Sequence, residues 1–352
     1  MNHIYQPYMP MHAVAPGDSL LINDDYAELV LHDLQGTPDQ PIHIHPATLT
    51  PRRLGRLIIH DSCQHVRVDG LHNLIICPFE PTPEAKELPL VQVGGMENTV
   101  KHCLIQTIND PWRWQAEDWH ALARDGIQLH GQDNAAIGNL IRHVRHGVEA
   151  FGEGSAILGN IYRDYCGDGI RLLNHDIEAA YNVGGYARLG NPDEHRDNMQ
   201  AWQHTALSPV DGCLRGLRIH HNGFYNPPEY PTAQGGLCFD GVLKGCEISY
   251  NTIITNHHHG LTIASAQGCT IIGNLIAHSG AGQSAWLMLG TRKPNHAVCS
   301  GNQLLDNRAQ RYELPPDACT PDSDPQAHPD DTIIRWAVQD CKIALAGLPS
   351  WL

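Results

Sequence analysis

Apolar and polar residues alternate in short runs that return along the chain. The clearest run, residues 125–129, has counterparts at 147–150, 168–172, 197–201 and 259–262. A period of two predicts a strand with one buried face, whereas a helix needs a longer run with a period of 3.6 residues. Glycine and asparagine separate the runs, which is typical of tight turns. The pattern therefore predicts many short strands joined by turns.

An asparagine closes each copy of the pattern. These residues are Asn139, Asn160, Asn182, Asn222, Asn251, Asn274 and Asn302. Successive members are 21, 22, 40, 29, 23 and 28 residues apart, a spacing that marks repeat proteins whose single copies cannot bury their own apolar face. Two or three strands in each copy fit one coil of a parallel β-helix. We expect the asparagines to lie at a bend that needs positive φ, with amides bonding up and down the stack.

The predicted fold class is all-β, a parallel β-helix solenoid. A leucine-rich repeat has a similar period, but its leucine-rich consensus is absent. We expect a lead at 1–16, the solenoid at 17–310, and a Pro/Asp-rich linker followed by a C-terminal helix at 311–352. Residues 332–346 have helical periodicity and are expected to form a short cap over the end of the solenoid, which otherwise exposes a sheet edge. A partner-binding helix is the alternative.

The composition limits the ligands. The net charge is −15 with only five lysines, and no basic cluster occurs, so nucleic-acid binding is disfavoured. The same charge would repel a strongly anionic glycan unless local arginines or a cation offset it. The 11 cysteines form no C-x-x-C pair. Cys246 and Cys269 each stand five residues before a repeat asparagine, which predicts stacked, reduced core thiols.

The chain carries no evident targeting signal. Residues 1–16 lack the basic and apolar regions of a Sec signal peptide, and no run is long enough to span a membrane. We therefore expect a soluble chain made in the cytoplasm, without a membrane partner. Association with a phage particle or a non-classical export route is compatible with this expectation.

The repeats imply a common outer wall, because strand residues alternate between the two faces of a sheet. The residues expected to stack inward are Ile127, Val148, Ile170, Met199 and Leu261. Their successors, expected to point outward, are Gln128, Glu149, Arg171, Gln200 and Thr262. Two positions before the inward set lie Asp125, His146, Asp168, Asp197 and His259. A shift of one residue would scatter this wall.

Carboxylates on this wall offer acid–base chemistry. Glu149, Asp168 and Asp197 would raise one another's pKa values, which keeps a carboxylic acid protonated near neutral pH, and Arg171 would hold one of them ionised. A glycosidase needs one carboxylic acid and one carboxylate, ~6.5–9.5 Å apart for inversion and ~5–5.5 Å apart for retention. Neighbouring and alternate coils offer both separations. Asp-Gly also opens a coil as plain turn chemistry, which we favour for Asp125 and leave open for Asp168.

The coil at 195–200 breaks the pattern. His195, Asp197 and Gln200 offer a proton acceptor, an acid or ligand, and an amide for hydroxyl groups. The phrase H-x-D-x-x-Q resembles one found in many carbohydrate-active parallel β-helices, in which a glycine often stands where this chain has Asn198. The candidate catalytic residues are Asp197, Asp168, His195 and Glu149. The candidate substrate contacts on the wall are Arg171, Gln200, Gln128 and His146.

The coil pattern over most of residues 16–305, with the opening phrase GTPDQPIHI at 36–44, resembles the right-handed parallel β-helix superfamily. This superfamily includes pectate lyases, polygalacturonases, alginate epimerases and phage tailspikes. The resemblance implies a right-handed solenoid with a polysaccharide or oligosaccharide as its partner. It leaves the oligomeric state open, a trimer included. The characteristic phrases of pectate lyases and polygalacturonases are missing, so no single family is indicated.

Two further features bear on binding. Trp112, Trp114 and Trp119 fall within eight residues and predict a stacking platform for sugar rings, the alternative being a loop packed over a coil end. Oxygen ligands from Asp168, Asp197 and Glu149 would suit Ca²⁺, the one cofactor considered. The histidines at 43–45 and 257–259 have no spacing that fixes three zinc ligands, and no metal site is assigned to them.

These features lead to three hypotheses. The first is a polysaccharide-cleaving enzyme that holds a glycan in an open groove along the wall and hydrolyses it by carboxylate general acid/base catalysis. The second is a lyase or epimerase, in which His195 or His146 removes the C5 proton of a uronic acid while Arg171, Arg196 or Ca²⁺ neutralises its carboxylate. The third is a non-catalytic β-helix that binds glycan or serves as a structural virion module.

Overall fold

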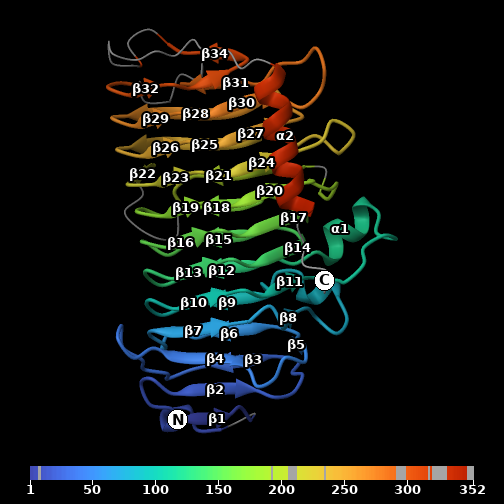
Figure 1. Ribbon diagram of the computed structural model, residues 1–352, viewed down its shortest axis with the longest axis vertical. Coiled ribbons are helices and arrows are strands. Elements are labelled where there is room, and N and C mark those ends of the chain that lie inside the picture. Colours follow the sequence, from blue (N-terminus) through green and yellow to red (C-terminus); the bar gives the residue numbers. More distant parts are fainter. Residues whose placement is uncertain are drawn as a thin grey trace.

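The computed structural model describes residues 1–6, 9–191, 193–204, 212–233, 235–290, 299–315, 318 and 331–346. Three long sheets, A, B and C, run the length of the molecule, and successive coils stack along its long axis (Figure 1). The pairings between neighbouring coils are parallel, for example β12 with β15 and β15 with β18 in sheet C. The chain is a right-handed parallel β-helix, so the predicted all-β solenoid is confirmed.

Each full coil contributes one strand to each sheet in the order A, B, C. Sheet A contains β1 (Asn2–Ile4), β2 (Ser19–Ile22), β4 (Ile42–Pro46), β7 (Val66–Asp69), β10 (Thr99–Lys101), β13 (Ala135–Ile137), β16 (Ala156–Leu158), β19 (Glu178–Ala180), β23 (Arg218–His220), β26 (Glu247–Ser249), β29 (Thr270–Ile272) and β32 (Gln303–Leu305). Sheet B contains β5 (Arg52–Leu54), β8 (Leu74–Ile76), β11 (Leu104–Gln106), β14 (Leu140–Val144), β17 (Ile161–Tyr165), β20 (Val183–Gly185), β24 (Gly223–Tyr225), β27 (Thr252–Thr255), β30 (Leu275–His278) and β33 (Arg308–Ala309).

Sheet C carries the candidate wall. It contains β3 (Leu29–Leu31), β6 (Leu57–Ile59), β9 (Val91–Val93), β12 (Ile127–Leu129), β15 (Val148–Ala150), β18 (Ile170–Leu172), β21 (Asp197–Ala201), β25 (Gly235–Lys244), β28 (His259–Gln267), β31 (Trp286–Leu289) and β34 (Arg311–Glu313), with β22 (Cys213–Arg215) beside β25. The helices are η1 (Met11–Ala13), η2 (Pro83–Ala85), α1 (Ala116–Leu122) and α2 (Asp331–Ala346). No helix within the described ranges is long and apolar enough to cross a membrane.

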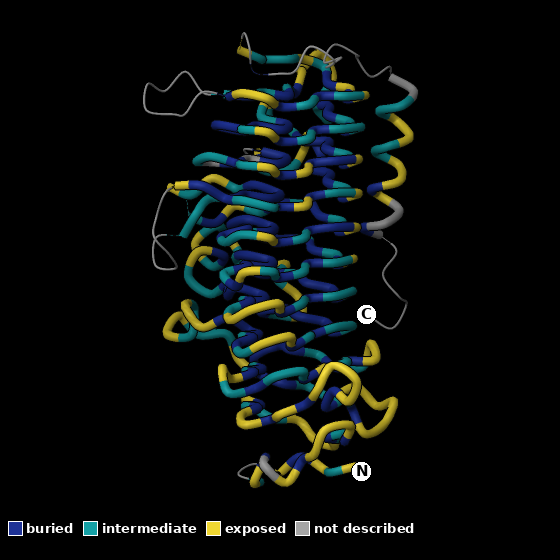
Figure 2. The backbone as a smooth tube through the Cα atoms, turned by 90° about the vertical axis from the view of Figure 1, so that its left-hand side faces the viewer, coloured by how far each residue is buried: buried dark blue, intermediate teal, exposed yellow. Residues whose placement is uncertain are grey.

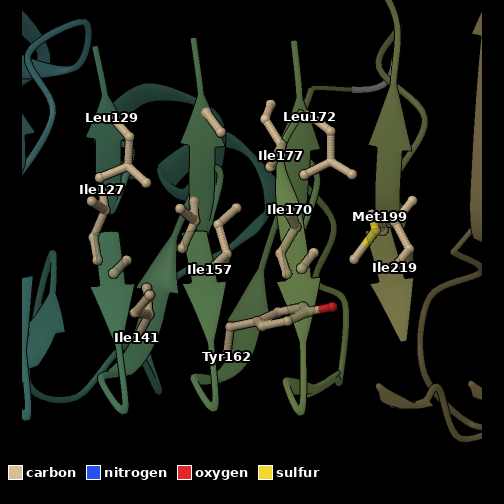
Figure 3. Packing of buried hydrophobic residues seen from close by; sticks show 14 of the residues in the cluster. Ile127, Leu129, Ile141, Ile157, Tyr162, Ile170, Leu172, Ile177, Met199 and Ile219 are labelled. Atoms are coloured by element: carbon tan, nitrogen blue, oxygen red, sulfur yellow. The ribbon is translucent and has the colours of Figure 1, made fainter. Parts of the chain in front are cut away.

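Apolar residues from the three sheets meet inside each coil. Ile127 of β12, Ile141 of β14 and Ile157 of β16 are fully buried, and Figure 3 shows them gathered between the strands. Buried segments recur in coil after coil, whereas exposed residues gather in the turns (Figure 2). Stacking therefore buries an apolar stripe that no single coil could bury. Cys246 and Cys269 lie in this core as free thiols, as predicted.

The repeat asparagines form a buried ladder at the corner between sheets A and B. The backbone N–H and the Nδ2 of Asn139 both donate to Oδ1 of Asn160 at 3.0 Å, and the same contacts recur in later coils. The predicted amide ladder is confirmed, but the positive φ falls on the preceding residue, for example +61° at Gly138. The ladder ends at Asn307 rather than at Asn302, whose Oδ1 accepts a bond outside it.

The C-terminal helix α2 forms where helical periodicity predicts it, but it does not cap the solenoid end. It lies along the outer face of sheet B, across β17, β20, β24 and β27 (Figure 1). Sheet B turns apolar side chains outward in these coils, among them Tyr225 and Ile254, and these pack with Cys341 and Leu345 of the helix. The apolar face of the helix is therefore buried against the side of the solenoid.

Strand pairing also begins earlier than expected. β1 lies within the first 16 residues and pairs with β2. Asp18 next to β2 accepts bonds from the amino terminus of Met1 and contacts His3 Nε2 at 2.9 Å. The first residues of the chain therefore extend sheet A by one strand.

Candidate active site

The outer face of sheet C carries the predicted wall. The register partners on the adjacent strands β12, β15, β18 and β21 are Gln128, Glu149, Arg171 and Gln200. Their inward neighbours are fully buried, so the wall faces outward as expected (Figure 3). Thr262 is not the next member, because β25 lies between β21 and β28.

This wall is covered to a large extent by its own side chains. Glu149 is 4% exposed and Gln200 is 7% exposed, whereas the side chain of Arg171 keeps 22% of its surface. The expected open groove is therefore not seen at these carboxylates within the described ranges. Hollows occur elsewhere, one of about 860 Å³ beside Asp61 and Gln64 and one of about 470 Å³ between α2 and the solenoid.

Glu149 is a buried carboxylate held from two sides. Gln128 Nε2 donates to its Oε2 at 2.9 Å, and Arg171 Nη1 donates to its Oε1 at 3.2 Å. Burial and the nearby charge of Asp125 raise its pKa to about 7, against the opposing effect of Arg171. Glu149 can therefore hold a proton near neutral pH, but both of its oxygens are already engaged.

Asp125 is part of a closed ion pair. The Nε and Nη2 of Arg145 donate to its two oxygens, both at 2.8 Å. Burial opposes ionisation, but the two bonds from Arg145 outweigh it and keep the pKa of Asp125 below its ordinary value. This bidentate pair gives Asp125 a structural role. Sequence reasoning favoured a non-catalytic role for Asp125 but did not identify Arg145 as its partner.

Asp168 lies at the centre of the wall and is 1% exposed. Its Oδ2 accepts from Arg171 Nε at 2.7 Å, and its Oδ1 accepts from the Asp197 N–H at 3.0 Å. Burial and the charge of Asp197 raise its pKa to about 6, although Arg171 opposes the shift. The N–H of Asp168 donates to Nδ1 of His146 at 2.8 Å. His146 is 2% exposed, and burial holds its pKa well below the ordinary value, so it acts as a neutral acceptor inside the wall.

Asp197 and His195 form the most unusual pair. Asp197 is fully buried, and neither of its carboxylate oxygens accepts a regular hydrogen bond within the described structure. The side chain of His195 is 42% exposed, and its Nδ1 lies 2.9 Å from Oδ2 of Asp197. A buried carboxylate without hydrogen bonds is costly, so this arrangement is difficult to explain as scaffolding.

Strand β21, which begins at Asp197, is held by hydrogen bonds from β17. Two fully buried tyrosines donate to Asn198, Tyr162 to its backbone oxygen at 2.9 Å and Tyr165 to its Oδ1 at 2.8 Å. The glycine often found at this position could not accept the second bond. Asn198 therefore ties β21 to β17 through two tyrosines that the sequence pattern did not reveal. Their spacing in 161–165 gave no sign of this role.

One set of side chains could hold a metal ion at this site. Asp168, His195 and Asp197 each bring a ligand atom within 4.8 Å of the others. Glu149, expected to join two of them around Ca²⁺, stands apart because Arg171 lies between it and Asp168. Two carboxylates and one imidazole suit a transition metal better than Ca²⁺, which prefers oxygen ligands.

The histidine run at 257–259 forms a second group of neighbouring rings. Nδ1 of His257 already accepts from the backbone N–H of His259 at 3.2 Å. A neutral ring with that acceptor carries its proton on Nε2, which leaves no lone pair there for a metal. The group therefore offers a poorer metal site than three adjacent histidines would indicate.

The tryptophan loop is mostly a packed element. Trp119 of α1 is 5% exposed and packs with Cys166 and, edge to face at 5.1 Å, with Trp114. Trp112 is 70% exposed and carries Arg113 over its ring at 4.6 Å. The three rings thus do not form a common platform. Trp112 alone keeps a large free surface, while Trp119 anchors the loop beside the turn that leads into Asp168.

Comparisons with known proteins add little beyond the fold. No protein-family model matches the chain, and no curated protein matches its sequence. A mannuronic acid-specific family 6 polysaccharide lyase from human gut microbiota is 12% identical, with 100% of this chain and 96% of that chain covered and a TM-score of 0.43. The catalytic unit of a GH87 α-1,3-glucanase from Streptomyces thermodiastaticus is 11% identical, with coverage of 86% and 65% and a TM-score of 0.46.

A surface adhesin of Streptococcus pneumoniae is similar to the same degree, at 10% identity, coverage of 88% and 85%, and a TM-score of 0.45. Likenesses of this size carry no functional argument. The three parallel sheets show the fold, a parallel β-helix, and no family is assigned.

Proposed function

We propose that the chain acts on a glycan at the outer face of sheet C, with His195 as the general base. The observation that carries the proposal is the contact between a half-exposed imidazole and a wholly buried carboxylate. In the proposed tautomer the proton is on Nδ1, whose distance to Oδ2 of Asp197 is 2.9 Å, and Nε2 is the nitrogen that accepts the substrate proton. Asp197 fixes the tautomer and stabilises the imidazolium that forms.

Arg171 and Gln200 are the proposed substrate contacts beside this base. Arg171 is held by Asp168 and Glu149, and its guanidinium carbon lies 5.2 Å from the ring centre of Trp202. These contacts hold the guanidinium against Asp168, which brings a carboxylate oxygen within 4.8 Å of a ring nitrogen of His195, and 22% of the Arg171 side chain stays exposed. Trp202 is a proposed addition to the substrate contacts that sequence reasoning did not single out.

This geometry favours proton abstraction over hydrolysis by two carboxylates. In β-elimination a base takes the C5 proton of a uronic acid and the C4–O bond breaks, so that a C4=C5 double bond forms. The glycosidic oxygen leaves and takes a proton from the imidazolium or from water. The wall offers the base in His195 and positive charge in Arg171. The oxygens of Glu149 and Asp168 are all engaged, which leaves them poorly placed to meet a sugar.

Hydrolysis remains the second candidate. Asp168 and Asp197 bring carboxylate oxygens within 4.8 Å of each other, near the ~5–5.5 Å of retaining glycosidases. The pKa of about 6 at Asp168 also supplies a carboxyl group that is partly protonated near neutral pH. This route requires the wall to open on binding, because both residues are buried.

Turnover of a polysaccharide panel tests the proposal. New ultraviolet absorbance from the C4=C5 bond identifies elimination, and new reducing ends without that absorbance identify hydrolysis. We expect His195→Ala to lower turnover by about 10²- to 10⁴-fold. His32→Ala is the matched control. Like His195, His32 is about half exposed (48%) and contacts an aspartate, Asp33, at 3.0 Å, but Asp33 is exposed rather than buried, so this variant should keep full turnover. Equal turnover in the His195 variant would contradict the assignment of His195 as the base. No turnover of any glycan by the wild type would point to a non-catalytic module.

A further inference from the structure

An arginine patch lies on the outer face of sheet B, and we define it as Arg142, Arg163 and Arg188. Arg142 of β14 and Arg163 of β17 are register partners on neighbouring strands, and Arg188 follows β20. Within the described ranges, the ion pairs of the patch go to one carboxylate, Asp164, which is 2% exposed. Three guanidinium groups thus share a single negative partner.

Such an excess of positive charge is unexpected in this chain. The net charge is −15, so the patch is not needed for solubility. Like charges on neighbouring strands, about 4.8 Å apart, destabilise a sheet. Burial, followed by the charge of Arg163, lowers the pKa of Arg142. Nε of Arg142 donates to Oε1 of Gln106 at 2.7 Å. Because Gln106 is neutral, this contact does not compensate the positive charge of Arg142.

The guanidinium groups of the patch are held in place before any ligand arrives. Arg163 lies over the ring of Tyr186 at 5.2 Å, and Arg188 lies over the ring of Tyr230 at 4.9 Å. Nε of each donates to Asp164 at 2.7 Å. The side chains nevertheless keep 26% and 36% of their surface exposed. Planar donors fixed in this way lose little entropy when they bind an oxyanion.

The patch borders the candidate active site. The backbone N–H of Arg188 donates to the oxygen of Tyr165 at 2.7 Å, where sheet B turns toward sheet C. The same loop continues from Arg188 to His195 and into β21. A glycan that crosses this corner would therefore contact both surfaces.

We propose that the arginine patch binds a carboxylate or sulfate group of an acidic glycan. The patch supplies the local positive charge that a chain of this net charge needs in order to hold an anionic polymer. The inference rests on the proposed function in one respect: the glycan that the patch binds is the one on which the sheet C site acts. It extends that function by assigning a second surface, on sheet B, that binds the acidic groups of the glycan outside the site of proton abstraction.

Calorimetric binding to the Asp197→Asn chain, which should not turn the ligand over, tests the patch. The probes are an oligogalacturonate, a sulfated oligosaccharide and a neutral cello-oligosaccharide of equal length. We expect at least one anionic probe to bind about tenfold more tightly than the neutral one, and the advantage to shrink with added salt. The stronger of the two anionic probes identifies the oxyanion.

Arg142→Gln and Arg188→Gln should each weaken anionic binding severalfold and leave neutral binding unchanged. The Arg142→Gln variant keeps the bonds that Arg163 and Arg188 donate to Asp164. A loss of binding in this variant is therefore not a consequence of breaking that ion-pair cluster. Arg218→Gln is the matched control, because Arg218 is 58% exposed on sheet A and pairs with Glu178. Equal binding of neutral and anionic probes, or an equal loss in the Arg218 variant, would overturn the proposal. Anionic binding to the patch without turnover in the wild type would contradict the proposed function alone.

Discussion

Two buried polar ladders run through this molecule, and they differ in how their polar atoms are satisfied. In the asparagine ladder, Asn160 Oδ1 accepts two bonds from Asn139, and Asn160 donates in turn to Asn182. On the sheet C wall, Asp197 is equally buried, yet its oxygens lack regular hydrogen bonds to the described part of the chain. Its contact with His195 reaches the surface.

This difference in hydrogen bonding distinguishes structural polar residues from candidate active-site residues. Buried polar groups in folded proteins are almost always paired, and a fully paired ladder stabilises the fold. A buried charge that is left nearly unpaired costs stability, and proteins tolerate that cost mainly where it serves function. Burial alone would not distinguish Asn160 from Asp197, whereas their hydrogen bonds do.

The largest expected effect comes from Asp197→Asn. We expect turnover to fall at least about 10²-fold, because His195 loses the carboxylate that fixes its tautomer. The free energy of unfolding should stay within about 1 kcal/mol of wild type or rise, since a buried charge is removed. Turnover assays and urea unfolding measure the two quantities. A variant that unfolds far more easily but stays active would show that Asp197 is scaffold.

Asn160→Ala should produce the opposite outcome. The substitution removes the acceptor of the Asn139 N–H and Nδ2 and the amide that donates to the Ala136 oxygen in the core, and we expect a loss of about 3 kcal/mol in unfolding free energy. Turnover per folded molecule should not change. Asn23→Ala, at an exposed position, is the control and should be nearly neutral. A stable Asn160 variant would contradict the structural role of the ladder.

The pH dependence of stability should come partly from Glu149. Its pKa is raised from 4.5 to about 7 in the folded chain, so the folded state binds more protons than the unfolded state in that window. The stabilising contribution is present below about pH 4.5 and is lost as pH rises through about 7, by at most about 3 kcal/mol. Glu149→Gln should flatten this part of the stability–pH curve. An unchanged curve would show that folding does not raise the pKa of Glu149.

The smallest expected effect is that of metal removal. If His195 is the base, chelation by EDTA followed by desalting should leave turnover unchanged. A loss that Ca²⁺ or Mn²⁺ restores would instead assign Asp168, His195 and Asp197 to a cation, as their mutual distances allow. Metal analysis of the purified chain accompanies the assay.

The coil register could be predicted from the sequence, because a period of two and a buried apolar face leave little freedom. Ile127, Ile170 and Met199 had to stack inward, and this fixed Arg171 beside Gln200. The covering of the wall could not be predicted, since the bond between Arg145 and Asp125 depends on side-chain reach across coils. A residue-type pattern gives the face of a side chain but not its partners.

The position of α2 was unpredictable for a similar reason. Helical periodicity indicated an apolar face, but not which surface would receive it. That surface is made by outward apolar residues of sheet B from separate coils, such as Tyr225 and Ile254. Each is isolated in the sequence, and only the stacking of coils joins them into a strip.

The most direct test of the account is the structure of the Asp197→Asn chain with a bound acidic oligosaccharide. We predict a sugar ring across the outer face of sheet C, with a ring carbon within about 3.5 Å of His195 Nε2 and an anionic group toward Arg171. An oligosaccharide bound on another wall, with His195 and Arg171 untouched, would contradict the assignment of this face as the active site.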